Sequence, residues 1–190
     1  MHSTIRILRS EHTALVALLR TATSMVERAR EQSSLPDFAL LRAMLFYIAE
    51  FPERHHHRKE SELLFPRLRA RTPLAHPLLD RLEDDHARGH ARIRDLEHAL
   101  VALEMLGPPR RAAFETALEQ YVDFYLVHMA LEEREVFPLA DSVLHARDWD
   151  ELDVEFGAGV DPLTGAEPEA AYASLFARLG PHLQASGSSS

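Results

Sequence analysis

Apolar and polar residues alternate along most of the chain with the period of an α-helix. Between residues 5 and 26, apolar side chains recur every three or four positions and so share one helix face. The same pattern returns three times, over residues 38–63, 79–103 and 114–139. Glycine and proline are sparse inside these stretches and gather between them. The chain therefore predicts four long helices, and no alternating stretch is long enough to predict a β-strand.

The short connections between these helices imply that each runs antiparallel to the next. We therefore predict an all-α fold, an up-down-up-down four-helix bundle with helices about 40–50 Å long. Pro52 falls inside the second helix, where it should kink the helix or remove a hydrogen bond. The bundle is expected to span residues 1–145. Residues 146–190 are expected to form an acidic C-terminal extension with short helices over 148–155 and 169–179, disordered over 186–190.

The composition narrows the functional classes. The chain has 190 residues and a net charge of −9 with histidine neutral, so no positive field favours a nucleic-acid partner. No apolar run approaches the roughly 20 residues that span a bilayer, and the first residues lack the apolar core of a signal peptide. Cysteine is absent, which excludes disulfides, thiolate zinc sites and cysteine catalysis. We expect a cytoplasmic protein, and its 12 histidines make a metal the first chemistry to consider.

Two segments of the chain repeat the same polar motif. The first begins at His56 and the second at His128, and both read H-x-x-x-E-x-x-x-[LV]-F-P. Each follows a helix that carries an acidic residue and a histidine, Glu11-His12 in the first half and Asp85-His86 in the second. Each half is thus predicted to be a helical hairpin. A pseudo-twofold axis between the hairpins would bring their polar residues to one level of the core.

The spacing of these residues directs them to one place. Residues four apart share a helix face, with Cβ atoms about 5–6 Å apart, and the polar residues fall on the inward faces. Buried imidazoles and carboxylates are costly unless something satisfies them, and metal ions do so. Seven ligands exceed what one tetrahedral zinc uses, so we predict a site for two ions. The predicted ligands are His12, His56, Glu60, His86, His90, His128 and Glu132.

The other histidines, tyrosines and glutamates singled out in the sequence are not interpreted as metal ligands. His55 and His57 flank His56 and are expected to point sideways, toward solvent or as hydrogen-bond partners of the ligands. Tyr121 and Tyr125 are interpreted as core residues that could also line a pocket beside the metal. Surface positions are expected for Glu62, Glu133, His2, His76, His98, His145 and His182.

The motifs resemble the hemerythrin-like family, also called the HHE cation-binding domain, over about residues 1–145. The resemblance implies a non-haem di-iron centre, with two iron ions joined by an oxo or hydroxo group. By analogy, one iron would be held by His86, His90 and His128, the other by His12 and His56, and both would be bridged by Glu60 and Glu132. The iron with two histidines would keep an open position, where dioxygen could bind.

Two features separate the chain from particular members of that family. The last bridging carboxylate of the oxygen-carrying hemerythrins is an Asp five residues after its His, whereas Glu132 follows His128 by four. Bacterial and eukaryotic HHE proteins commonly show the form seen here. The cysteine-containing N-terminal extension of the iron–sulfur repair members is absent as well. These features argue against pure oxygen carriage and against iron–sulfur repair.

We predict a non-haem di-iron protein that binds or senses dioxygen or a related diatomic molecule, or handles iron. The alternative is a di-iron oxidoreductase acting on peroxide, nitric oxide or a small substrate, so enzymatic activity stays open. A structural bundle loaded with zinc or manganese is a further interpretation, because imidazole and carboxylate accept several metals. A ferritin-like site would use Glu53-x-x-His56 and Glu83-x-x-His86, but it leaves three of the seven predicted ligands without a role. No protein partner can be named from the sequence.

Overall fold

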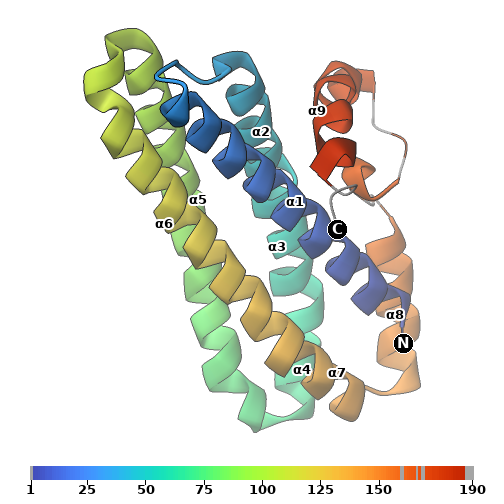
Figure 1. Ribbon diagram of the computed structural model, residues 1–190. Helices are drawn as coiled ribbons and strands as arrows, with labels where there is room; N and C mark the ends of the chain where they lie inside the picture. The colour runs from blue at the N-terminus through green and yellow to red at the C-terminus, as the bar shows by residue number, and fades with distance from the viewer. Residues whose placement is uncertain (1, 159–160, 166, 168–169, 187–190) are drawn as a thin grey trace.

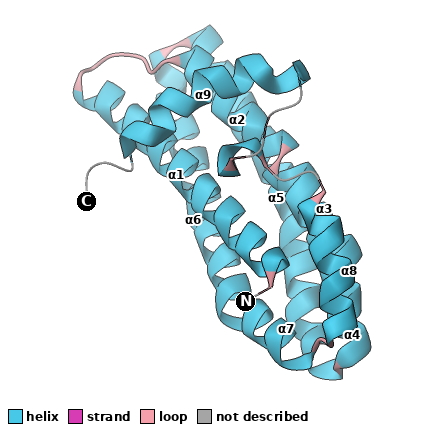
Figure 2. Cartoon of the chain, turned by 90° about the vertical axis from the view of Figure 1, so that its right-hand side faces the viewer, coloured by secondary structure: helices cyan, strands magenta, loops and turns pink. Residues whose placement is uncertain are grey.

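Four long antiparallel helices form the body of the part of the chain that the structure describes (Figure 1). The computed structural model describes residues 2–158, 161–165, 167 and 170–186, and these residues form helices and no strand (Figure 2). The first helix is α1 (Ser3–Glu31) and the third is α5 (His76–Leu106), while the second and fourth run over residues 38–71 and 111–143. The predicted all-α, up-down-up-down bundle is confirmed. Within the described residues, no helix is long and apolar enough to cross a membrane.

The second and fourth helices are interrupted by π-helical turns. The second helix consists of α2 (Phe38–Glu50), the π-turn η1 (Pro52–His56), α3 (His57–Lys59), the π-turn η2 (Glu60–Leu64) and α4 (Phe65–Arg71). The fourth consists of α6 (Arg111–Leu131), the π-turn η5 (Glu132–Val136) and α7 (Phe137–Val143). Short 3₁₀ turns, η3 (Pro73–Ala75) and η4 (Pro108–Arg110), lie at the connections on either side of α5.

The π-turns η2 and η5 occupy equivalent places in the sequence repeat. In η2 the N–H of Phe65 donates to the carbonyl of Glu60, five residues back, instead of four as in an α-helix. The next residue, Pro66, has no N–H to donate, so a wider turn before it fits the interrupted hydrogen-bond ladder. The [LV]-F-P part of the motif therefore marks a local widening of the helix directly after the motif's glutamate.

A third π-turn, η1, begins at Pro52. The N–H of His57 donates to the carbonyl of Pro52, again five residues back. The disturbance predicted at this proline thus takes the form of a wider turn. One extra residue in a turn shifts the inward face of everything that follows by one position, and this shift bears on which histidines face the core.

A polar layer divides the apolar core into two clusters. One cluster fills the half of the bundle that contains the α1–α2 connection, with Leu18, Leu41, Leu96 and Phe114 at its centre. The other fills the opposite half, where the apolar residues of α4, α7 and the start of α1 meet those of the extension. On every long helix, buried polar residues lie between the two clusters. Six of the seven predicted metal-site residues come from this layer.

The C-terminal extension packs on the bundle (Figures 1 and 2). Helix α8 (Ala146–Gly157) lies along the first turns of α1 and buries Trp149, Leu152 and Phe156 in the second apolar cluster. Burial of one such side chain contributes about 1.5–3 kcal/mol, so this docking is strong. The carboxylate of Asp153 also accepts hydrogen bonds from the first amides of α1.

The rest of the extension contacts α1 and α2. It contains two 3₁₀ turns, η6 (Pro162–Thr164) and η7 (Ala170–Tyr172), and helix α9 (Ala173–Ser186), which packs against α1 and α2. The expected second short helix is therefore present, but it begins later than the sequence suggested. Ser186 belongs to α9, and the disorder expected for residues 187–190 lies outside the described residues. The division at residue 145 stays a prediction.

Candidate metal centre

The polar layer gathers buried histidines around two buried glutamates. Glu60 and Glu132 are completely buried and face each other from the second and fourth helices. Their positions at the starts of η2 and η5 follow from the H-x-x-x-E repeat. The imidazoles around them come from all four long helices. The structure thus brings together six of the seven predicted residues: His12, His56, Glu60, His86, His128 and Glu132.

The layer contains two neighbouring positions where a cation fits. At the first position, ligand atoms of four buried residues lie within 4.8 Å of one another: His12, His56, Glu60 and Glu132. At the second position the same holds for Glu60, His86, His128 and Glu132, and His57 also lies within this distance of His86 and His128. Both glutamates therefore belong to both positions. This is the arrangement expected of carboxylates that bridge two ions.

The distances support this sharing. The Nε2 atom of His12 is 3.2 Å from Oε2 of Glu132, and that of His128 is 3.3 Å from Oε1 of the same carboxylate. On the other glutamate, Oε2 of Glu60 lies 3.4 Å from Nε2 of His56 and 3.5 Å from Nε2 of His86. Each carboxylate therefore sits between a histidine of one half of the bundle and a histidine of the other.

Many polar atoms of this layer lack a hydrogen-bond partner among the described residues. They are both carboxylate oxygens of Glu60 and Glu132 and the Nε2 atoms of His12, His86 and His128. Leaving a buried polar group unpaired costs about 1–3 kcal/mol, so their convergence calls for something that satisfies all of them together. Imidazole and carboxylate ligands in this number suit divalent iron, manganese or zinc. The donor set therefore fits a pair of bound cations.

The other ring nitrogen of each histidine has a polar neighbour, at hydrogen-bond distance for His12, His56 and His86. Nδ1 of His56 lies 2.7 Å from Oε2 of Glu11, and Nδ1 of His128 lies 3.8 Å from Oδ2 of Asp85, the residue equivalent to Glu11 in the other half. An acceptor on Nδ1 fixes the ring orientation and directs Nε2 toward the centre.

The remaining two histidines follow the same rule. Nδ1 of His12 lies 3.0 Å from Oε1 of Glu133, and Nδ1 of His86 lies 3.0 Å from Oγ of Ser61. Glu133 and Ser61 each come directly after a central glutamate, so they are equivalent in the repeat. The interpretation of Glu133 as a surface charge is thus incomplete. The side chain is 36% exposed, but its carboxylate orients His12.

Protonation shows how the layer balances its charge without a cation. Burial works against protonated imidazoles, but the carboxylates outweigh it. Contacts with Glu132 and Glu133 raise the pKa of His12 to about 9. Contacts with Glu132 and Glu60 raise the pKa of His86 to about 9, and the charge of Glu132 raises that of His128 to about 10. The pKa of Glu132 itself lies well below its ordinary value, because these histidines outweigh its burial. At neutral pH, protonated imidazoles therefore balance the charge of the buried carboxylates.

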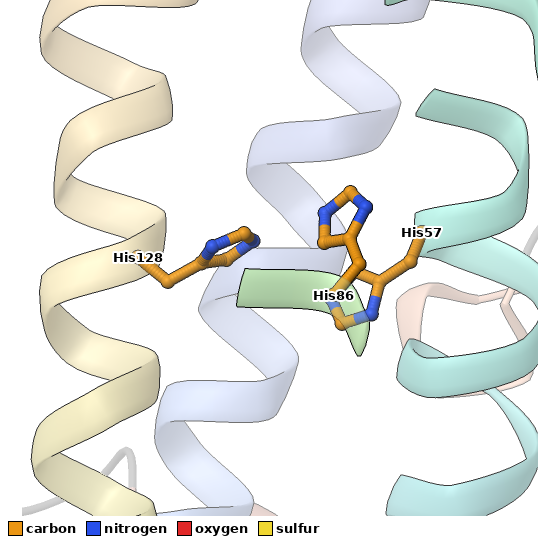
Figure 3. A group of neighbouring side chains, drawn as sticks. All are labelled: His57, His86 and His128. Atoms are coloured by element: carbon orange, nitrogen blue, oxygen red, sulfur yellow. The ribbon is translucent and has the colours of Figure 1, made fainter. Parts of the chain in front are cut away.

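The set of histidines that face the centre differs from the predicted one. His57 is buried, and its ring stacks on His86 with ring centroids 4.1 Å apart and planes 11° apart (Figure 3). His57 was expected to point sideways, because neighbours on a regular α-helix diverge by about 100°. The π-turn η1 ends directly before His57 and shifts the inward face, so both His56 and His57 are buried in the layer. Pro52, inside an otherwise helical pattern, was the sequence signal for this shift.

His90 lies apart from the other six predicted ligands in the structure, and its role as a ligand stays a prediction. Its side chain is 50% exposed, and its Nδ1 atom lies 3.5 Å from Oε2 of Glu53 instead of near the other imidazoles. Helix α5 is regular here, and a residue four positions after His86 stands about 40° around the helix from it. The inward place on this turn is taken by Gly89, which is buried. The i, i+4 spacing alone could not choose between these two positions.

Gly89 makes room for a further buried carboxylate, that of Glu53. A Cβ atom at Gly89 would lie 2.7 Å from the hydroxyl oxygen of Tyr125 and 2.9 Å from Oε1 of Glu53. Glu53 accepts hydrogen bonds from the hydroxyls of Tyr125 and Tyr121, the latter at 3.1 Å. Its Oε2 atom lies 3.4 Å from Nδ1 of His57, so Glu53 is the orienting partner of that histidine. Burial raises the pKa of the Glu53 carboxyl, although both tyrosine hydroxyls oppose this effect.

A cavity of about 10 Å³ adjoins both positions, enough for one small molecule about the size of water. Tyr125 lies in its wall, whereas Tyr121 is not among its lining residues. The cavity is lined by Glu11, His12, Leu15, Pro52, His56, His57, Tyr125, His128, Met129 and Asp161. The last of these belongs to the C-terminal extension, whose role the sequence did not indicate.

Comparison with known proteins supports a cation-binding role. The family model described as the hemerythrin HHE cation binding domain matches residues 3–140, which is most of the chain and includes the whole polar layer except Asp161. No curated protein and no solved structure matches the chain. The family match indicates a metal-binding helical domain, and the buried histidines and glutamates of the polar layer fit a metal site.

Proposed function

We propose, from the premise that this chain belongs to the hemerythrin HHE cation-binding domain family, that its polar layer holds two iron ions and binds dioxygen or a related diatomic molecule. One observation carries the proposal: two buried carboxylates without hydrogen-bond partners are shared by two groups of imidazoles. His12 and His56 would hold one ion, and His57, His86 and His128 the other. Glu60 and Glu132 would bridge them. Iron would supply a reversible change of oxidation state at this place.

The size of the cavity favours a diatomic ligand. A cavity volume of about 10 Å³ holds one molecule about the size of water, so a small ligand such as a diatomic molecule suits it better than an organic substrate. The first position has two imidazoles and the second has three, so the first has more room for an external ligand. The chain contributes orientation of the imidazoles and a buried environment. Sensing of the ligand or handling of iron is compatible with the same centre. We also propose that the protein is cytoplasmic.

The proposal is tested by metal analysis of the purified protein and by its visible spectrum before and after air reaches a reduced sample. We expect about two irons per chain and absorption that changes reversibly with dioxygen. Two irons with irreversible oxidation would indicate iron handling or an oxidoreductase instead of reversible binding. One zinc per chain, or no metal after reconstitution with ferrous iron, would overturn the di-iron assignment.

A second candidate is an oxidoreductase that acts on peroxide or nitric oxide. The observation in its favour is Tyr125, which lines the cavity with its hydroxyl bonded to the buried Glu53. A carrier needs no such polar pair beside its ligand, whereas an enzyme uses positioned proton donors and acceptors. Steady-state turnover of hydrogen peroxide or nitric oxide by the iron-loaded protein tests this candidate. Turnover that falls in Tyr125→Phe at unchanged iron content would support it, and absence of turnover in the unsubstituted protein would exclude it.

A further inference from the structure

One residue of the C-terminal extension reaches the polar layer. Asp161 lies outside the region that the family model matches, yet it is buried and lines the same cavity as Glu11 and His56. The preceding part of the extension is attached nearby, because Nζ of Lys59 donates to the carbonyl oxygens of Phe156 and Ala158. The position of Asp161 beside the histidines therefore results from tertiary docking.

The side chain of Asp161 is held by two defined donors. Its Oδ1 atom accepts the N–H of Leu163 at 2.8 Å and so caps the 3₁₀ turn η6. Its Oδ2 atom accepts the hydroxyl of Tyr47, a completely buried residue of α2. A carboxylate fixed at both oxygens cannot turn away from the bundle without breaking these bonds. Tyr47 and η6 thus hold the backbone of Asp161 against α1.

The partner that Asp161 faces across the cavity is Glu11. The backbone amide of Asp161 donates a hydrogen bond to the Glu11 carboxylate, beside the cavity that both residues line. Glu11 in turn holds Nδ1 of His56 at 2.7 Å. A continuous chain of contacts leads from Tyr47 through Asp161 and Glu11 to His56.

Among the residues that the structure describes, no segment of the extension covers the other half of the bundle in this way. Asp85, the equivalent of Glu11, is paired with Arg88 at 3.0 Å and lies at the edge of an open groove of about 600 Å³. The distance from Asp85 to Nδ1 of His128 is 3.8 Å, which is longer than a hydrogen bond. The short contact between Glu11 and His56 thus coincides with the presence of the extension.

We propose that Asp161 is a positioning residue: it holds Glu11 in place so that His56 keeps its Nε2 atom toward the first cation position. The C-terminal extension then helps to position a histidine of the metal centre, and it does so at the first of the two cation positions only. The part of the inference that concerns the cation rests on the proposed function. The part that concerns the orientation of His56 does not.

The orientation is tested first on the metal-free full-length protein. NMR of the histidine rings reports the Nδ1–H proton of His56, which is assigned by its loss in His56→Ala. In Asp161→Ala we expect this proton to exchange with water at least about tenfold faster, while the ring signals of His86 stay unchanged. Tyr47→Phe should act in the same direction and more weakly. Asp161→Asn keeps one side-chain oxygen that can accept from Tyr47 or from the N–H of Leu163, and it should restore most of the protection.

Asp153→Ala is the matched control. Asp153 also belongs to the extension and ties α8 to the first amides of α1, but it contacts no residue of the polar layer. This variant tests whether any loosening of the extension is enough to accelerate exchange of the His56 proton. We expect the exchange rate of the His56 proton to equal that of the unsubstituted protein. An equal acceleration in Asp153→Ala and Asp161→Ala would show general loosening and overturn the proposal.

The second test loads the protein with Co²⁺ and follows its removal by a chelator. In Asp161→Ala one of two ions should leave at least about tenfold faster and the other at the unchanged rate. Unchanged ring signals together with unchanged release would overturn the proposal. If the ring signals change but the unsubstituted protein binds fewer than two Co²⁺ ions, then the positioning role stands and the two-cation function fails.

Discussion

The two halves of the bundle, residues 1–71 and 76–143, place the same chemistry at equivalent positions. Glu11 corresponds to Asp85, His12 to His86, His56 to His128 and Glu60 to Glu132. Even the partners of the rings correspond, because Ser61 holds His86 and Glu133 holds His12. Each half thus supplies two histidines for one position and one glutamate for both.

The two halves differ in one histidine, because the first half supplies a third imidazole to the second cation position. The residue after His56 is His57, whereas the residue after His128 is Met129. His57 is turned inward by the additional π-turn of the first half and joins the two histidines of the second. A near-symmetric repeat therefore builds two different positions, one with two imidazoles and one with three. The comparison teaches that a single insertion in a helical turn can make a symmetric frame chemically asymmetric.

The largest effect is expected when either central glutamate is altered, because both halves depend on both. In Glu60→Gln or Glu132→Gln the neutral amide cannot bridge two cations, and metal content after dialysis should fall from about two ions per chain to below about one. Metal analysis of the dialysed protein measures this. Glu62→Gln, an exposed neighbour, is the matched control and should keep full metal content. Retention of two ions in both central variants would contradict a shared carboxylate pair.

The next effect should separate the two positions. His57→Met gives the first half the residue that the second half carries, and it should weaken the second position by at least about tenfold, or about 1.4 kcal/mol. The first position should be unaffected. Competition between the protein and a chelator for Co²⁺ measures both affinities. His90→Ala is the control, and a loss of cation binding in it comparable with that in His57→Met would restore the ligand set predicted from sequence.

Alkaline pH should lower the free energy of unfolding of the metal-free protein, because its protonated histidines lose their charge next to the buried glutamates. His12 and His86 have a folded-state pKa of about 9 and His128 of about 10, against 6.5 as the ordinary value. Their contribution to stability is complete below pH 6.5 and is lost as the pH rises through 9. Each proton adds a slope of about 1.4 kcal/mol per pH unit in this window. Urea unfolding between pH 6 and 10, in chelator, measures the free energy of unfolding.

The cation-loaded protein provides the comparison for this pH series. Bound cations replace the protons, so the free energy of unfolding should depend less on pH above 6.5 than in the metal-free protein. A metal-free protein whose stability stays constant from pH 6.5 to 9 would contradict the proposed proton balance.

The smallest effect concerns Gly89, whose equivalent in the first half is Leu15. Gly89→Ala would press a Cβ atom against Tyr125 and Glu53 and should lower the free energy of unfolding by about 1–3 kcal/mol. Thermal unfolding by circular dichroism measures the change. Gly157→Ala meets no atom within 4 Å and serves as the control. If both variants unfold at the same temperature, the prediction is wrong, because Glu53 and Tyr125 can then move aside to accommodate the Cβ atom.

The sequence by itself determined the four helices, their antiparallel order and the level of the polar layer. These features are local, because hydrophobic periodicity sets a helix face and the spacing of a histidine from its glutamate sets a shared side. The H-x-x-x-E repeat and the acidic-histidine pairs thereby located six of the buried residues, and their role as ligands stays a prediction.

Only the tertiary structure decided which further imidazole faces the centre and what holds each ring. The choice of His57 over His90 depends on a π-turn and on the space that Glu53 occupies beside Gly89. The approach of Asp161 to Glu11 depends on the docking of the extension onto α1. Such contacts join residues far apart in the chain, and no local period encodes the distance between them. They arise when apolar packing on both sides of the polar layer fixes the helices against one another.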